Sequence, residues 1–165
     1  MKDELLFWNI VQNMLMRNTG STTVLLEAII GCEVNVKVLR QEKVYPNFTL
    51  KWKGDAVCRE TALFIGEKDV SHNIVYINWE GLDNDIRDEL ILGKKPIGKI
   101  IMDTDHRRKI LYSGNMIHSK HFETDNYCND IVKKYEIWRK NVCLFVINET
   151  YFLQNLKYCV NQRKQ

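Results

Sequence analysis

Residues 142–152 have the sequence VCLFVINETYF, and their alternation indicates the kind of fold to expect. Successive side chains of a β-strand point to opposite faces, so Phe145, Ile147, Glu149 and Tyr151 share one face. A face that is mostly apolar and aromatic is typical of a strand that packs on a core. If it does, the carboxylate of Glu149 is buried at a cost, unless it has a partner or a function.

A second strand of this kind is expected over residues 57–65, where Arg59 shares a face with Leu63 and Ile65 while Glu60 points to the other face. An inward arginine and an inward glutamate on different strands could line an anion pocket inside a sheet. The alternatives are a structural ion pair between them, or two charges that face outward from edge strands. The pattern alone leaves these possibilities open.

The rest of the chain predicts more strands and two groups of helices. Helical spacing predicts helices over 3–17 and 22–30, with Ser21 as the N-cap of the second and Gly31 as its end. We expect further strands over 33–44, 74–79, 110–117, 135–139 and 142–153, short helices over 83–92 and 97–102, and a loop over 118–130. Consecutive strands with gathered helices favour an α+β fold with an antiparallel sheet, in a single domain over residues 1–165.

Composition is typical of a globular protein and excludes several classes of function. Of the 165 residues, 45% are hydrophobic and 27% charged, and the net charge is +3. That charge is too small to argue for nucleic acid as a partner, although it suits a small anionic ligand. No stretch is long and apolar enough to span a membrane, and the acidic start is unlike a signal peptide. We therefore expect a cytoplasmic protein without a membrane partner.

Metal and cofactor motifs are missing or weak. The five cysteines are scattered without a C-x-x-C pair, which is typical of reduced thiols in a cytosolic protein. Phosphate loops, dinucleotide fingerprints, zinc-protease motifs and serine-hydrolase elbows do not occur. His118 and His121 are spaced like metal ligands, but they lie in a polar stretch without a third ligand. We expect no metal site and no cofactor.

Two backbone features fit an anion site. Residues 21–23 (STT) open a helix after Gly20, and a helix N-terminus offers free N–H groups to a carboxylate. Residues 92–98 (LGKKPIG) predict a glycine-flanked turn whose amides could do the same. Ordinary capping and turn chemistry explains either feature equally well.

Taken in their order along the chain, these segments resemble those of the chorismate lyase (chorismate pyruvate-lyase) family, including its small archaeal-type members. The resemblance covers nearly the whole chain. It is carried by STT at 21–23, VKVLRQE at 36–42, CRET at 58–61, LGKKPIG at 92–98, WR at 138–139 and NETYF at 148–152. Each motif is short, and their order and spacing together are more specific than any one of them.

The resemblance implies a sheet with helical flaps that close over an internal ligand cavity. The implied reaction eliminates pyruvate from chorismate to give 4-hydroxybenzoate, without a cofactor. By position, Arg59 would bind the ring carboxylate, helped by the backbone N–H groups of Thr22 and Ile97. Glu149 would face the ring hydroxyl, either as a base or only to orient it. Arg139 matches a family arginine on the penultimate strand and is included among the expected substrate-binding residues.

Two other functions compete with a lyase. The same fold serves as the small-molecule sensing domain, the UTRA domain, of GntR-type transcription regulators. Those sensors follow a winged helix, for which the hairpin ahead of residue 33 leaves no room, so we expect a free-standing domain. The third possibility is a structural or partner-binding domain in which Arg59 and Glu149 merely pair. A sensor needs no carboxylate opposite its anion site, so Glu149 discriminates between a lyase and a sensor. The oligomeric state, monomer or dimer, is left open.

Overall fold

The computed structural model describes residues 2–45, 52, 54–117 and 129–163, which form a six-stranded sheet and five α-helices. The strands are β1 (Asn35–Val44), β2 (Ala56–Ile65), β3 (Lys68–Asn78), β4 (Arg107–Ile117), β5 (Asn129–Arg139) and β6 (Val142–Tyr151). The helices are α1 (Lys2–Arg17), α2 (Thr22–Ile30), α3 (Asn84–Leu92), α4 (Ile97–Ile100) and α5 (Leu153–Gln162). The predicted α+β class is therefore confirmed.

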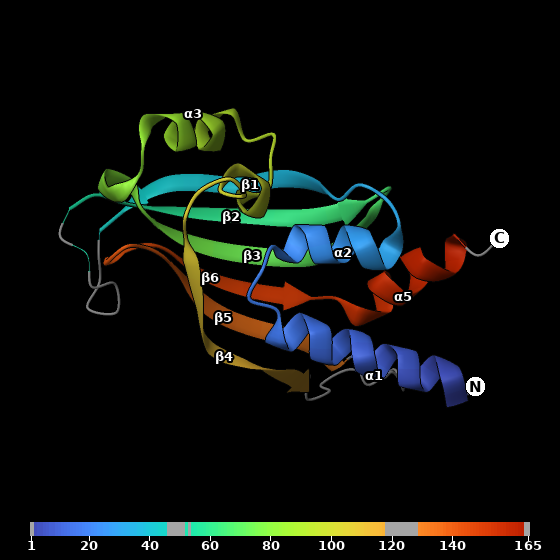
Figure 1. The fold of residues 1–165 in the computed structure, drawn as a ribbon. Helices are drawn as coiled ribbons and strands as arrows, with labels where there is room; N and C mark the ends of the chain where they lie inside the picture. The colour runs from blue at the N-terminus through green and yellow to red at the C-terminus, as the bar shows by residue number, and fades with distance from the viewer. Residues whose placement is uncertain (1, 46–51, 53, 118–128, 164–165) are drawn as a thin grey trace.

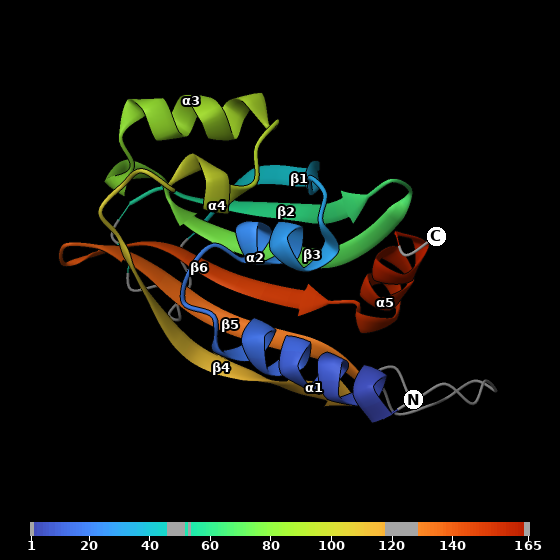
Figure 2. The ribbon, with the colours of Figure 1, turned by 45° about the vertical axis from the view of Figure 1, so that its right-hand side comes forward.

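The sheet is antiparallel throughout, with the strand order β1-β2-β3-β6-β5-β4 (Figure 1). Strands β3 and β6 are thus central, although the helices α3 and α4 and two strands separate them in the chain. Helices α1, α2 and α4 lie over the same face of the sheet, and α5 continues from the end of β6 (Figure 2). No helix of the described residues is long and apolar enough to cross a membrane.

The buried apolar side chains of the covered face form two clusters. The first joins α1, α2 and α5 to the sheet through residues such as Leu15, Leu26, Ile131, Tyr151 and Leu156. The second joins α3 and α4 to the sheet through residues such as Ile77, Ile86, Leu90, Ile137 and Phe145. Since one strand contributes to both clusters, as β6 does, the two lie one after the other along the strands.

A row of buried polar side chains crosses the sheet between these clusters. The register places Thr61 opposite Asn73, Asn73 opposite Glu149, and Glu149 opposite Lys133. Directly opposed residues project to the same face, and all four are buried. Arg59 lies two residues before Thr61, so it joins the row on that face. Buried polar side chains between two apolar clusters indicate a candidate functional site.

Most predicted elements are confirmed, including the Ser21 cap of α2 and the left-handed Gly31 that ends it. Four predicted boundaries were wrong. Strand β3 begins at Lys68, not 74, and was missed there because its first half is polar. Strand β4 begins at Arg107, not 110, and β5 begins at Asn129, inside the predicted loop. Helix α5 replaces the predicted end of the last strand at Leu153 and extends beyond it. The rest of that loop, with His118 and His121, lies outside the described residues.

Candidate functional site

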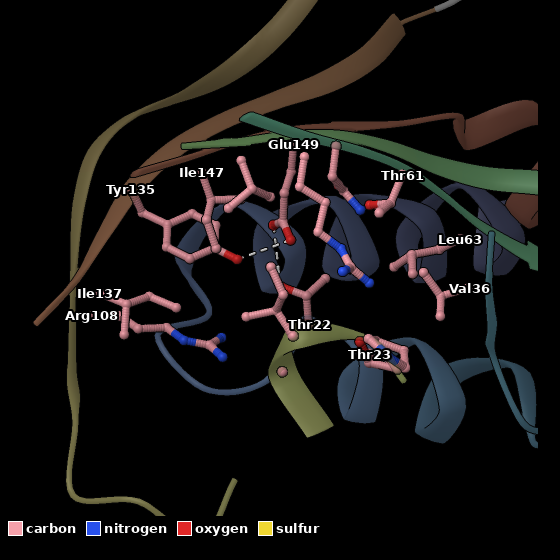
Figure 3. Close-up of a pocket in the computed structure, with 16 residues that line it drawn as sticks. Thr22, Thr23, Val36, Thr61, Leu63, Arg108, Tyr135, Ile137, Ile147 and Glu149 are labelled. Carbon is pink, nitrogen blue, oxygen red and sulfur yellow. Dashed lines mark hydrogen bonds between the residues drawn. The ribbon is translucent and has the colours of Figure 1, made fainter. Parts of the chain in front are cut away.

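A cavity lies between the polar row of the sheet and the starts of α2 and α4 (Figure 3). Residues 22–23 and 96–98 cover it, and all six strands contribute side chains that line it. The unfilled space there, including the part open to solvent, is about 460 Å³, but only about 30 Å³ lies far enough from every wall for the centre of a water molecule. The space is therefore narrow, and an organic ligand requires α2 and α4 to move outward.

Arg59 is a buried cation, and three of its five N–H donors have no partner. Its exposed fraction is 1%. Nη1 donates to Oε1 of Gln41 at 2.6 Å and to the carbonyl oxygen of Leu90 at 2.5 Å, while Nε and Nη2 are buried without a partner. Burial lowers the pKa of Arg59, which reflects the cost of desolvating its charge. No described carboxylate forms an ion pair with it, so the structural pair with Glu149 is not formed.

Arg108 brings a second guanidinium to the same cavity. Its Nε and Nη1 atoms are also buried and without a partner, and its Cζ lies 5.6 Å from the centre of the Tyr135 ring. Figure 3 shows this side chain reaching from β4 into the cavity. The sequence analysis did not include it among the site residues. The alternation from Ile110, which packs on the second cluster, would have placed Arg108 on the inner face.

Glu149 has an exposed fraction of 5%, and neighbouring hydroxyls hold its carboxylate. Oε1 accepts a hydrogen bond from Tyr135 at 2.9 Å, and Oε2 accepts one from Thr22 at 3.2 Å and another from Tyr151. Burial, and then the charge of Glu149, raise the pKa values of Tyr135 and Tyr151 well above normal, so both stay protonated donors. A carboxylate offers about four lone-pair sites, and these three bonds leave one on Oε1. Glu149 can therefore accept one more hydrogen bond, from a ligand.

The cover of the cavity depends on a close contact between α2 and α4. A Cβ on Gly98 would lie 2.6 Å from Oγ of Ser21, so only glycine allows α4 to approach the N-cap of α2 without a shift. Nζ of Lys99 lies 2.7 Å from Oε1 of Glu27, which ties the two helices together. Thr22 and Ile97 therefore both lie in the cover of the cavity. The role of their N–H groups in binding stays a prediction.

The structure thus brings Thr22, Arg59, Ile97 and Glu149 to one cavity, and it leaves Arg139 out. Arg139 lies at the end of β5 and forms an ion pair with Asp83, at the start of α3. Arg139 therefore does not line the cavity in this conformation, and its role in substrate binding stays a prediction.

Two further predictions concern side chains away from the cavity. Glu60 points away from it, as the alternation predicted, and its Oε1 lies 2.9 Å from Nε2 of His72. The described part of the chain holds no group of three or more His, Cys, Asp and Glu residues suited to a metal ion.

The comparisons with known proteins concern the fold alone. No protein-family model matches the chain, and no curated protein matches it. Among solved structures, the effector domain of PhnF from Mycobacterium smegmatis aligns with a TM-score of 0.60 at 10% identity, over 82% of this chain and 90% of that one. The structure of PhnF itself aligns with a TM-score of 0.62 at 10% identity, over 84% of this chain but 66% of that one.

A third match is the ligand-binding domain of a putative GntR-family regulator from Bordetella bronchiseptica, with a TM-score of 0.50 at 9% identity. It covers 72% of this chain and 84% of that one. Two of these neighbours are thus an effector domain and a ligand-binding domain. The chain therefore has the fold of a UTRA-type effector domain, which is the fold class that the sequence predicted.

Proposed function

We propose that this chain is a small-molecule-binding domain of the UTRA type, which takes up an organic anion between the sheet and helices α2 and α4. The observation that carries the proposal is the unpartnered pair of nitrogens, Nε and Nη2, on the fully buried Arg59. A buried cation without a counter-ion is costly, and a carboxylate offsets that cost by accepting two parallel hydrogen bonds. The N-terminus of α2 adds further N–H donors at the same wall.

The other side chains of the cavity support a more detailed ligand. Arg108 offers a second cationic site, and Oε1 of Glu149 has room for one hydrogen bond from a hydroxyl. Ile137, Ile147 and Val75 supply apolar walls suited to a flat carbon skeleton. A hydroxylated aromatic or cyclohexadiene carboxylate matches this set, and 4-hydroxybenzoate is the simplest probe of it.

A second candidate function, chorismate lyase, is favoured by the placement of Glu149 in the same cavity as two arginines. Chorismate carries two carboxylates and a ring hydroxyl, and its elimination to pyruvate and 4-hydroxybenzoate needs no cofactor. Arg59 would hold the ring carboxylate, and Glu149 would orient the hydroxyl or accept the C4 proton. The three hydroxyl groups that already bond Glu149 leave one lone pair on Oε1, which suits a hydrogen bond from the ring hydroxyl and favours the orienting role.

The binding proposal is tested by titration calorimetry of 4-hydroxybenzoate into the wild type, Arg59→Met and Arg40→Met. Arg40 is a suitable control because it lies on the neighbouring strand β1 with its side chain 55% exposed. We expect Arg59→Met to weaken binding by roughly 100-fold, since two charge-assisted hydrogen bonds are lost, and Arg40→Met to leave binding unchanged. Equal affinities in all three proteins would contradict the proposal.

The lyase candidate is tested by mixing the protein with chorismate and following pyruvate through a coupled dehydrogenase, with the aromatic product identified by chromatography. A lyase gives equal amounts of pyruvate and 4-hydroxybenzoate, and Glu149→Gln slows their release. Binding of 4-hydroxybenzoate without turnover of chorismate leaves the sensing function and removes the lyase.

A further inference from the structure

Lys133 is a buried lysine at the β5 end of the polar row, next to Glu149, and it does not line the cavity. Its exposed fraction is 2%. Nζ donates to the carbonyl oxygen of Leu15 at 3.2 Å and to that of Asn18 at 2.5 Å. Leu15 lies in the last turn of α1, and Asn18 begins the connection to α2. The ammonium group therefore caps the C-terminal end of α1, where the helix dipole favours a cation.

The same connection is held from its other end by Glu149, which lies directly opposite Lys133 in the sheet. Residues 18–21 lead into Thr22, whose hydroxyl donates to Oε2 of Glu149. Two neighbouring side chains of the sheet thus fix the first and last parts of one short segment. The position of Thr22 over the cavity depends on both of them.

Lys133 also contacts the second partner of Glu149. Its Nζ lies 5.3 Å from the centre of the Tyr135 ring, and Tyr135 donates to Oε1 of Glu149. A cation over an aromatic face is attracted by the ring electrons and restrains the ring. One ammonium group therefore acts on two of the three hydroxyl donors that surround the carboxylate.

A charged lysine is an expensive way to fill this place. Burial lowers the pKa of Lys133, the charge of Glu149 raises it, and that of Arg108 lowers it further. A methionine of similar length would fill the same space without the desolvation cost. This cost is explained if the charge and the N–H donors of Lys133 hold in place the side chains that line the cavity.

We propose that Lys133 is a positioning residue for ligand recognition, which fixes the α1–α2 connection and Tyr135 so that one lone pair of Glu149 Oε1 stays free for a ligand hydroxyl. This inference rests on the proposed function, because it concerns how the same cavity distinguishes ligands. Lys133 does not touch the ligand. It acts through Thr22, Tyr135 and Glu149.

The test compares wild type, Lys133→Met, Lys133→Arg and Lys134→Met. Lys134 is the matched control, since it is the next residue of β5 and its side chain is exposed on the other face. Calorimetry gives the affinities of 4-hydroxybenzoate and of benzoate, which lacks the hydroxyl. Amide hydrogen exchange of the protein without ligand reports on the connection through Gly20, Val24 and Leu25, which bond to Asn18 and Ser21.

In the wild type and Lys134→Met we expect about a tenfold preference for 4-hydroxybenzoate, the size of one hydrogen bond to a charged acceptor. Lys133→Met should reduce that preference to near one and speed exchange in the connection. Lys133→Arg, which keeps the charge and the donors, should keep at least part of the ligand preference and of the protection from exchange. Equal weakening of both probes by Lys133→Met would show a structural role only and overturn the inference.

The two proposals can fail separately. If the wild type binds neither probe, the proposed function fails for this ligand class, and the exchange data still decide the role of Lys133. Unchanged exchange in Lys133→Met would overturn the inference in that case. If the wild type prefers 4-hydroxybenzoate and Lys133→Met keeps the same preference, the function stands and the inference is overturned.

Discussion

Two arginines of the cavity have different environments, and this difference separates their roles. Arg59 is fully buried and holds Gln41 and Leu90 with one nitrogen, whereas Arg108 is half-buried and lies over Tyr135. Both have two unpartnered buried nitrogens. A ligand with one carboxylate needs only the more deeply buried arginine, and a ligand with two can use both.

Replacing Arg108 by methionine should therefore separate two ligands. We expect Arg108→Met to weaken the binding of chorismate, which has two carboxylates, about tenfold more than the binding of 4-hydroxybenzoate, which has one. Titration calorimetry with both ligands measures the two losses of affinity. If the protein turns chorismate over, the chorismate titration is carried out at 4 °C and within minutes. Arg107→Met is the control, since Arg107 is exposed on the same strand. Equal losses for the two ligands would show that Arg108 does not recognise a second anionic group.

Replacing Arg59 should have two opposing effects on the free energy of unfolding. Arg59→Met removes a buried charge that lacks a counter-ion, which favours folding, but it leaves the Leu90 carbonyl without its donor. These effects oppose each other, so we expect the free energy of unfolding to change by less than about 2 kcal/mol. Urea denaturation measures it. A loss of more than about 4 kcal/mol would show that Arg59 serves mainly the fold.

Residue types and alternation predicted Arg59 and Glu149, because a charge on an apolar face of a strand stands out from its neighbours. The same rule would have found Arg108, had the strand been extended to it. The partners Tyr135 and Tyr151 were not predicted, since an aromatic residue on an inner face is usually core. Arg139 was included on a short motif alone, which does not say whether a side chain at the end of a strand faces the cavity.

At the level of elements, α2 and α4 form the cover of the cavity, and an ion pair between Lys99 and Glu27 joins them. Burial raises the pKa of Glu27, but hydrogen bonds from Lys99 and the Val34 amide lower it by more, so the net change is downward. The hydrogen bond to Glu27 raises the pKa of Lys99 more than burial lowers it. The pair is therefore charged at neutral pH.

The pH range over which the ion pair of Lys99 and Glu27 stabilises the protein follows from the directions of their two pKa shifts. The part due to Glu27 is fully present above the unfolded carboxyl pKa of about 4.3 and is lost as the pH falls through the lower folded value. The part due to Lys99 is present below about 10.4 and is lost as the pH rises through the higher folded value. We expect the stability difference between wild type and Glu27→Gln to be constant from about pH 5 to 9 and to shrink below about pH 4.

Urea unfolding at pH 3, 5, 7 and 9 measures this difference. Glu33→Gln is the control, because Glu33 lies 3.6 Å from Lys99 with its side chain 76% exposed, and such pairs contribute little. A difference for Glu27→Gln that is the same at pH 3 and pH 7 would show that the ion pair does not stabilise the cover.

Elements with strong local patterns were predicted well, and those held by distant contacts were not. The cap and the glycine of α2 define it from the sequence alone. Helix α5 was missed because its buried residues, Leu156, Cys159 and Val160, gain their partners from elements far away in the sequence, chiefly β3 and α2. The first half of β3 was missed because it buries Ser71 and Asn73, which do not resemble a strand core.

At the level of the whole molecule, two apolar clusters support a polar site between them. Some core residues, such as Ile137 and Ile147, also line the cavity, whereas others lie away from it and are expected to serve the fold alone. Leu156 belongs to the first cluster, has an exposed fraction of 1% and does not line the cavity. Its truncation should therefore affect folding and not recognition.

Leu156→Ala should lower the free energy of unfolding by about 2–5 kcal/mol, through lost burial and the space left behind. The affinity for 4-hydroxybenzoate should stay within about twofold of the wild type at a temperature where the variant is folded. Leu92→Ala, at a position that is 61% exposed, is the control and should change stability by about 0.5 kcal/mol or less. If Leu156→Ala instead weakens binding as much as Arg59→Met, the separation of site and core is wrong.

The most direct test of the binding site is a crystal structure of the protein with 4-hydroxybenzoate. The account predicts the carboxylate within about 3 Å of Nε and Nη2 of Arg59, and the hydroxyl within the same distance of Oε1 of Glu149. It also predicts that α2 and α4 lie farther apart than in the present structure, because the cavity is too narrow for a ring. A ligand bound elsewhere, or an unoccupied cavity at saturating ligand, would contradict the account.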